Sequence, residues 1–100
     1  MCGGKEGGVS LEGVDLTTQA VIQGVVRREG EPLAGAYVRL LDRSGEFTAE
    51  VPTSATGQFR FFAGPGRWTV RTLAPRATSV DRSVVARTGE VAEVEVHVSA

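Results

Sequence analysis

The 100-residue sequence has one cysteine, one histidine and no long run of apolar residues. A single cysteine cannot form a disulfide within the chain and is typical of a reducing compartment, so we expect a cytoplasmic protein. The short apolar runs predict no membrane-spanning helix, and the glycine-rich start lacks the apolar segment of a signal peptide. The formal net charge of −1 gives no field that would recruit nucleic acid or an anionic membrane.

The scarcity of histidine also limits the chemistry that the chain can perform. A serine nucleophile needs a base, and a metal site needs several clustered ligands, but His97 is expected to point outward from the last strand with only Glu95 beside it on that face. No glycine-rich turn precedes a helical pattern that would cradle phosphate. We therefore expect a non-enzymatic protein with no catalytic residues, no metal site and no cofactor.

What the chain does contain is a β pattern. Apolar and polar residues alternate in seven short segments, at 19–27, 36–41, 47–51, 58–62, 67–72, 78–85 and 92–98, and turn residues separate them. No helical periodicity is present. The pattern predicts an all-β fold, a seven-stranded antiparallel Greek-key β-sandwich over residues 19–100, preceded by a flexible glycine-rich tail at 1–18.

The stretch Thr53–Val70 carries four of the six aromatic residues, so we expect the core to form around it. Phe59 and Phe61 share the inner face of their strand. Gly24 lies inside the first strand without a side chain, which predicts that a neighbouring backbone or ring packs over it. In the third strand, Phe47 shares a face with Ala49 and Val51.

Two apolar residues, Leu41 and Phe62, fall on nominally outward positions of their strands. Each is a candidate for a protein interface, or for cover by the N-terminal tail.

Three arginines, Arg39, Arg60 and Arg71, are also expected to point outward. They are candidates for a patch that binds an acidic partner or sulfur oxyanions. The alternative is that they pair across strands with Glu50, Glu93 or Glu95.

Four motifs resemble the carboxypeptidase-regulatory-like domain over about residues 19–75. They are Ile22-x-Gly-x-Val26, Gly30-x-Pro-Leu-x-Gly-Ala36-x-Val-x-Leu40, Thr56-Gly-x-Phe-x-Phe61 and Pro65-Gly-x-Trp-x-Val70. The resemblance implies a transthyretin-like sandwich, and such domains mostly serve as adhesive, stabilising or interaction modules.

A second resemblance spans nearly the whole chain. The similarity lies in the start Met1-Cys2-Gly3, in the runs 38–42, 46–51 and 54–62, and in Pro65, Gly66, Trp68 and Thr69. Through these residues the chain is similar to the small actinobacterial family of sulfur-metabolism protein SseC. This resemblance implies an association with thiosulfate sulfurtransferases. It carries over no catalytic residue.

Three hypotheses for function follow. The first is an accessory binding module that works with a sulfurtransferase. The second is a sulfur carrier, in which removal of Met1 leaves the Cys2 thiol beside a terminal amine, where it accepts sulfane sulfur as a persulfide. The third is a structural, homo-oligomeric sandwich.

Overall fold

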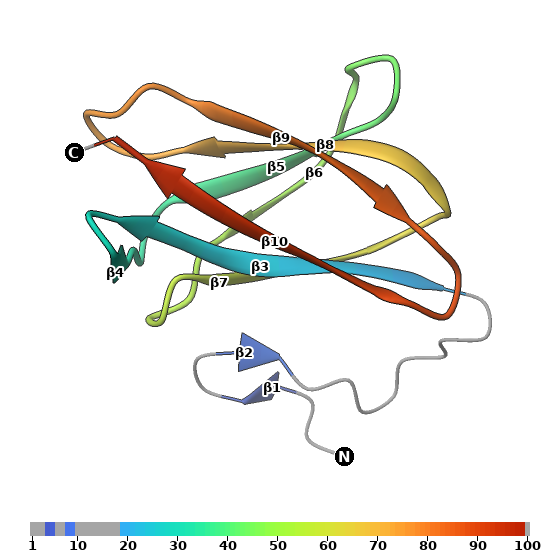
Figure 1. Ribbon diagram of the computed structural model, residues 1–100, viewed down its shortest axis with the longest axis horizontal. Helices are drawn as coiled ribbons and strands as arrows, with labels where there is room; N and C mark the ends of the chain where they lie inside the picture. The colour runs from blue at the N-terminus through green and yellow to red at the C-terminus, as the bar shows by residue number, and fades with distance from the viewer. Residues whose placement is uncertain (1–3, 6–7, 10–18, 100) are drawn as a thin grey trace.

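The computed structural model describes residues 4–5, 8–9 and 19–99, and all regular structure in these residues is β (Figure 1). Two-residue strands β1 (Gly4–Lys5) and β2 (Gly8–Val9) pair antiparallel. The glycine-rich composition did not predict these two strands. The rest of the predicted tail, including Cys2, lies outside the described residues. Among the described residues no helix is long and apolar enough to cross a membrane.

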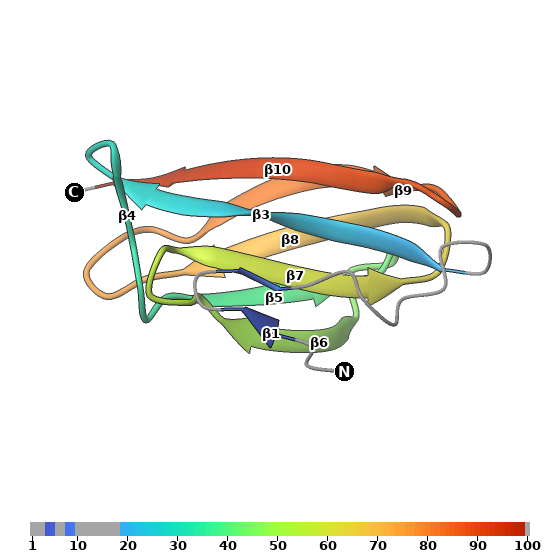
Figure 2. The ribbon, with the colours of Figure 1, turned by 90° about the horizontal axis from the view of Figure 1, so that it is seen from below.

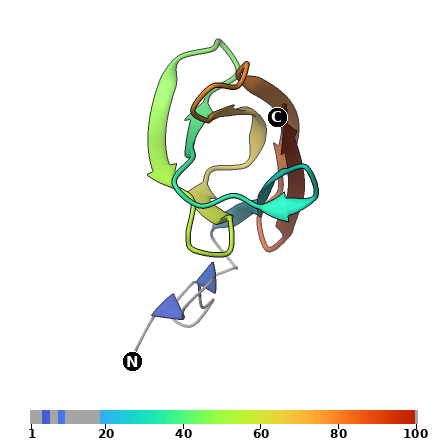
Figure 3. The same ribbon diagram turned by 90° about the vertical axis from the view of Figure 1, so that its left-hand side faces the viewer.

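The remaining strands form two sheets that enclose one core (Figures 2 and 3). In the first sheet, β3 pairs with β10 on one edge and with β4 and β7 on the other. The second sheet has the order β6-β5-β8-β9. The bounds are β3 Ala20–Arg28, β4 Glu31–Pro32, β5 Tyr37–Leu41, β6 Phe47–Pro52, β7 Gln58–Ala63, β8 Gly66–Leu73, β9 Val80–Ala86 and β10 Val91–Val98. The predicted seven-stranded β-sandwich is confirmed, and β4 is a short addition to it.

The pairing of β10 with β3 is parallel, with Val91 opposite Val21 and Val98 opposite Arg28. Every other pairing between the described strands is antiparallel, as predicted. The exception arises because β9 belongs to the second sheet. The chain therefore crosses from one sheet to the other before β10, and it enters the first sheet beside β3 in the same direction.

At Gly24, atoms of β10 and β7 occupy the space where a side chain on β3 would lie. A Cβ atom placed on Gly24 would lie 1.7 Å from the Val94 carbonyl oxygen of β10 and 2.9 Å from Cζ of Phe59 on β7. Both the backbone and the ring expected from the sequence thus pack over this glycine. The two core phenylalanines, Phe59 and Phe61, lie with ring centroids 6.1 Å apart.

The pairing of β5 with β6 contains a register shift between Leu40 and Leu41 that changes the predicted orientation of Phe47. The shift places Phe47 opposite Leu41, and Phe47 is 61% exposed instead of facing the core with Ala49. Leu41 is flanked by Phe47 on β6 and Thr69 on β8 and is only 6% exposed. The expectation that Leu41 presents a free outward surface is therefore wrong.

Two buried threonines differ in how their hydroxyl groups are satisfied. Thr53 Oγ1 donates to the Leu33 carbonyl at 2.8 Å and accepts from the Ala36 amide at 3.0 Å, which ties the loop before β5 to the end of β6. Thr72 Oγ1 is buried and has no hydrogen-bond partner in the described part of the chain. A buried hydroxyl without a partner loses the hydrogen bonds that it made to water.

We predict that Gly24→Ala lowers the free energy of unfolding by about 3 kcal/mol, because the added methyl group meets backbone atoms that cannot rotate away. Gly64→Ala is the matched control, since no atom lies within 4 Å of its Cβ position. We expect the control to change stability by no more than about 0.5 kcal/mol. Urea denaturation of both variants measures the difference. Equal effects would contradict the packing assigned to Gly24.

We predict opposite effects for two identical substitutions at the buried threonines. Thr72→Val removes an unpaired hydroxyl and should raise the free energy of unfolding by about 1 kcal/mol, whereas Thr53→Val breaks two hydrogen bonds and should lower it by about 1–3 kcal/mol. Thermal and urea denaturation report both changes. A destabilised Thr72→Val protein would show that its hydroxyl has a partner after all.

Candidate functional site

The outer face of the second sheet carries a row of four charged residues, one from each strand. Arg39 on β5 lies opposite Glu50 on β6 and Arg71 on β8, and Arg71 lies opposite Asp81 on β9. Arg39 Nε donates to Glu50 Oε1 at 2.8 Å. Arg71 donates through Nε and a terminal nitrogen to the two Asp81 oxygens, at 2.9 and 3.0 Å. The two arginines thus lie side by side in the middle of the row, and each pairs with the carboxylate at its own end of the row.

The bidentate pair of Arg71 and Asp81 changes the acidity of both groups. Hydrogen bonds from Arg71, supported by its charge, lower the pKa of Asp81 below the ordinary value of 3.8. The same hydrogen bonds and the charge of Asp81 raise the pKa of Arg71. Both side chains keep their charge at neutral pH, so this part of the row is a fixed ion pair.

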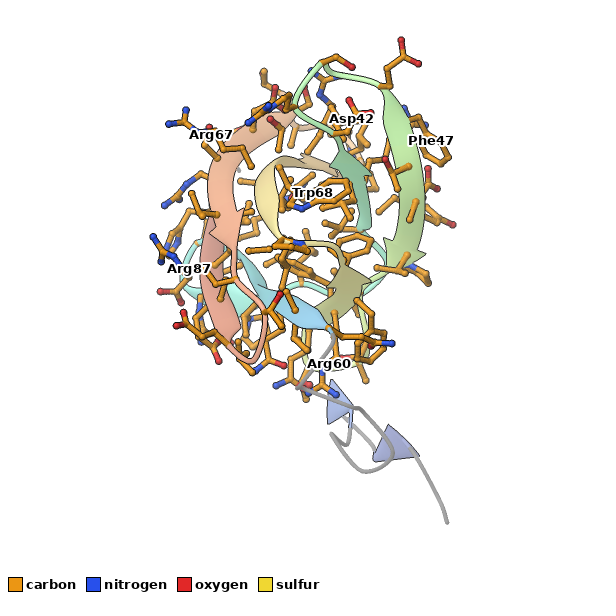
Figure 4. All side chains as sticks on the ribbon, turned by 90° about the vertical axis from the view of Figure 1, so that its right-hand side faces the viewer. Asp42, Phe47, Arg60, Arg67, Trp68 and Arg87 are labelled. Carbon is orange, nitrogen blue, oxygen red and sulfur yellow. The ribbon has the colours of Figure 1, made fainter. Side chains whose placement is uncertain are left out.

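Large apolar side chains lie on the same face as this row. Tyr37 is two residues before Arg39 on β5 and is 50% exposed. Phe47 comes before Glu50 on β6 and is 61% exposed. Figure 4 shows the Phe47 ring on the outer side of its strand. Val85 on β9 is 44% exposed. We call the outward residues of this sheet the four-strand face; they are Tyr37, Arg39, Phe47, Glu50, Arg71, Asp81 and Val85.

The outer face of the first sheet carries a separate polar network. Arg60 Nε on β7 donates to Gln23 Oε1 at 2.9 Å, and Gln23 Nε2 donates to Glu93 Oε2 on β10 at 2.8 Å. Arg27 pairs with Glu95 at 2.6 Å. The hydrogen bond from Arg27 lowers the pKa of Glu95 below 4.5.

Phe62 belongs to this second surface. It lies on β7 opposite Val21 of β3 and is 53% exposed, so the outward direction expected for it is confirmed. We call the outward residues that β7, β3 and β10 contribute to this sheet the three-strand face; they are Gln23, Arg27, Arg60, Phe62, Glu93 and Glu95.

The structure divides the predicted arginine patch between the two sheets. Arg39 and Arg71 share the four-strand face, whereas Arg60 lies on the opposite side of the sandwich. The expectation of one patch from all three arginines is therefore wrong. Cross-strand pairing is confirmed for Arg39 with Glu50, but Arg71 pairs with Asp81, which the alternation did not single out.

The described residues contain no group of three or more His, Cys, Asp or Glu side chains that is arranged to hold a metal ion. His97 Nε2 lies 3.9 Å from Glu95 Oε1 on the solvent side of β10, so the predicted outward direction of this histidine is confirmed.

Sequence reasoning missed the exposure of Tyr37, Phe47 and Val85. The alternation of β5 gave a signal for Tyr37, because Val38 and Leu40 point inward. No local signal marked Phe47, since its direction depends on the register shift.

Comparison with known proteins gives a family and a fold. A model of the family described as "Protein of unknown function (DUF1416)" matches residues 2–98. The uncharacterized protein Rv0814c of Mycobacterium tuberculosis is 57% identical over 75 residues, which cover 73% of this chain and 75% of that protein. These descriptions assign no activity, and the sulfur connection stays a prediction.

Solved structures with a similar fold have unrelated roles. The minor pilin GBS52 of Streptococcus agalactiae matches with a TM-score of 0.70 at 12% identity, over 82% of this chain and 44% of the pilin. The dioxygenase domain of a dioxygenase carbohydrate-binding protein fusion from Streptomyces sp. SirexAA-E matches with a TM-score of 0.66 at 13% identity, over 83% and 80%. Identity this low shows only that the fold is shared.

We predict that stability falls as the pH drops through and below 3.8, because Asp81 binds protons more readily in the unfolded chain than in the folded one. The contribution of Asp81 is present above its unfolded pKa and is lost as the pH falls through its lowered folded pKa. Asp81→Asn and Arg71→Gln should each flatten this part of the curve, and the double variant should flatten it no further. The measurement is urea denaturation from pH 2 to 7. Additive effects would show that the two groups are not coupled.

Proposed function

We propose that this chain, which belongs to the DUF1416 family of proteins of unknown function, is a non-enzymatic module that binds a protein partner through its four-strand face. The observation that carries the proposal is the exposure of Tyr37 and Phe47 on either side of the paired arginines. Aromatic side chains and arginine are the residues most enriched where proteins bind one another, and lysine is depleted there.

The spacing on the sheet makes this face a rigid platform. Tyr37 and Leu41 are the ends of β5, so Tyr37 and the Phe47 ring opposite Leu41 stand about 14 Å apart along the strand. The charged row lies between them. Because regular strands hold both rings, little conformational entropy is lost when a partner covers them.

The charge on the face favours an apolar contact over an electrostatic one. Two arginines and two carboxylates cancel within the row, and both arginines already have hydrogen-bonded partners. Most of the binding free energy therefore comes from burying the two rings. Covering the central ion pairs costs desolvation energy unless the partner offers hydrogen bonds to them, which disfavours partners that lack such groups.

The resemblance to the sulfur-metabolism family suggests the partner, a thiosulfate sulfurtransferase. In this proposal the chain docks on that enzyme and performs no sulfur chemistry of its own. The carrier hypothesis, which assigns the chemistry to Cys2, and the homo-oligomer hypothesis make different predictions in the same experiment.

We predict that tagged wild-type protein retains a thiosulfate sulfurtransferase of the source organism on an affinity column. Tyr37→Ala and Phe47→Ala should each weaken the complex by roughly tenfold or more, the loss expected for an aromatic anchor at an interface. Phe62→Ala is the matched control, because Phe62 is comparably exposed on the opposite face. Titration calorimetry with the purified enzyme gives the affinities.

Three outcomes would contradict the proposal. Loss of the complex only in Phe62→Ala would move the interface to the three-strand face. Loss of sulfur transfer in Cys2→Ser, with the complex intact, would favour the carrier. A stable oligomer of the chain that retains no sulfurtransferase would favour the structural role.

A further inference from the structure

A hollow of about 300 Å³ lies beside the four-strand face, at the end of the sandwich where β8 begins and β9 ends. Its lining comes from the turn after β5 and from these two strands, with Arg43, Arg67, Trp68, Thr69, Ser83, Val84 and Val85 contributing. Figure 4 looks onto this end of the molecule, with Trp68 at the centre and Arg67 pointing away from the core.

Two guanidinium groups at the hollow have no partner among the described residues. Of the other arginines, three pair with carboxylates, two donate to backbone carbonyls and Arg60 donates to Gln23, while Arg76 and Arg87 do not line the hollow. By contrast, Arg43 and Arg67 make no hydrogen bond and no ion pair with any described residue. Because a guanidinium group carries five donors, these two arginines present an unused set of donors to one small space.

Two hydroxyl groups complete this donor set. Thr69 on β8 and Ser83 on β9 are register partners, and neither hydroxyl has a hydrogen-bond partner in the described part of the chain. Register partners on antiparallel strands stand about 5 Å apart. Arg67 is two residues before Thr69 and therefore projects from the same side of β8.

The carboxylate of Asp42, which adjoins the hollow, accepts hydrogen bonds from its own turn. Asp42 lines an adjoining hollow that shares Arg43, Arg67 and Trp68. Its Oδ1 atom accepts from the Ser44 amide at 2.9 Å, the Ser44 hydroxyl at 2.8 Å and the Glu46 amide at 3.0 Å. These hydrogen bonds lower the pKa of Asp42, so its charge stabilises the turn that holds Arg43.

We propose that this hollow binds a small tetrahedral oxyanion, with Arg43 and Arg67 as its charged ligands and the Thr69 and Ser83 hydroxyls as neutral ones. Planar guanidinium groups match the paired oxygens of sulfate, thiosulfate or phosphate and donate two parallel hydrogen bonds to them. The hollow has room for such an anion together with several water molecules. This inference does not depend on the proposed partner, because the four ligands all come from one chain.

The test is a titration of the full chain, followed by the amide signals in NMR spectra. Sodium sulfate, thiosulfate and phosphate are added separately at constant ionic strength, and sodium chloride is the control, because screening alone shifts signals of charged surfaces. We expect saturable shifts for Arg43, Arg67, Thr69 and Ser83 with the three oxyanions and none with chloride. Stronger binding of thiosulfate or of phosphate identifies the biological source of the anion.

A matched pair of variants makes the assignment specific. Arg67→Gln should weaken oxyanion binding by roughly tenfold, the effect of losing one charged hydrogen-bonding group. Arg76→Gln removes the same charge in the loop beyond the other end of β8 and should leave the affinity unchanged. Both positions are exposed, and equal melting temperatures confirm that both variants fold. Linear shifts, equal shifts with chloride, or an equal loss in Arg76→Gln would overturn the proposal.

Discussion

The close contact between β3 and β10 at Gly24 is the constraint on which the arrangement of the molecule depends. The Val94 carbonyl lies where a side chain at Gly24 would be, and Phe59 closes the same space from β7. The first and last strands of the sandwich can therefore lie side by side in parallel, although they come from opposite ends of the domain. This pairing brings Glu93 and Glu95 of β10 beside Gln23 and Arg27 of β3, where they form the polar network of the three-strand face.

The two outer faces consequently have different characters. The three-strand face is spanned by hydrogen bonds and a salt bridge between polar side chains, with Phe62 at one end. The four-strand face has its charges paired in one row and aromatic residues on either side of that row. The unpaired donors of Arg43 and Arg67 gather at the end of the sandwich beside this second face. The proposed protein surface and the proposed anion site thus lie next to one another.

Sequence patterns predicted the strands because the alternation of apolar residues is a local property of each strand. They also predicted the close packing at Gly24, since a glycine inside a strand leaves a space that something must fill. The exposure of Phe47 was not predictable, because it follows from a register shift between two strands, and the alternation gave no signal for the burial of Leu41 at an outward position. The separation of Arg60 from Arg39 and Arg71 depends on which sheet each strand joins, and no single strand carries that information. Likewise, no single strand shows that Arg43 and Arg67, which have no partner among the described residues, line the same hollow.

If the four-strand face is the binding surface, a thiosulfate sulfurtransferase should slow hydrogen exchange there, which can be measured with and without the enzyme. Exchange slows where a partner covers backbone amides, and it reports on all strands at once without a substitution. We expect the amides of β5 and β6 around Tyr37 and Phe47 to exchange more slowly when the enzyme is bound, and those of β7 and β10 to exchange at the same rate. Protection confined to β7 and β10, or no added protection when the enzyme is in excess, would contradict a binding surface on the four-strand face.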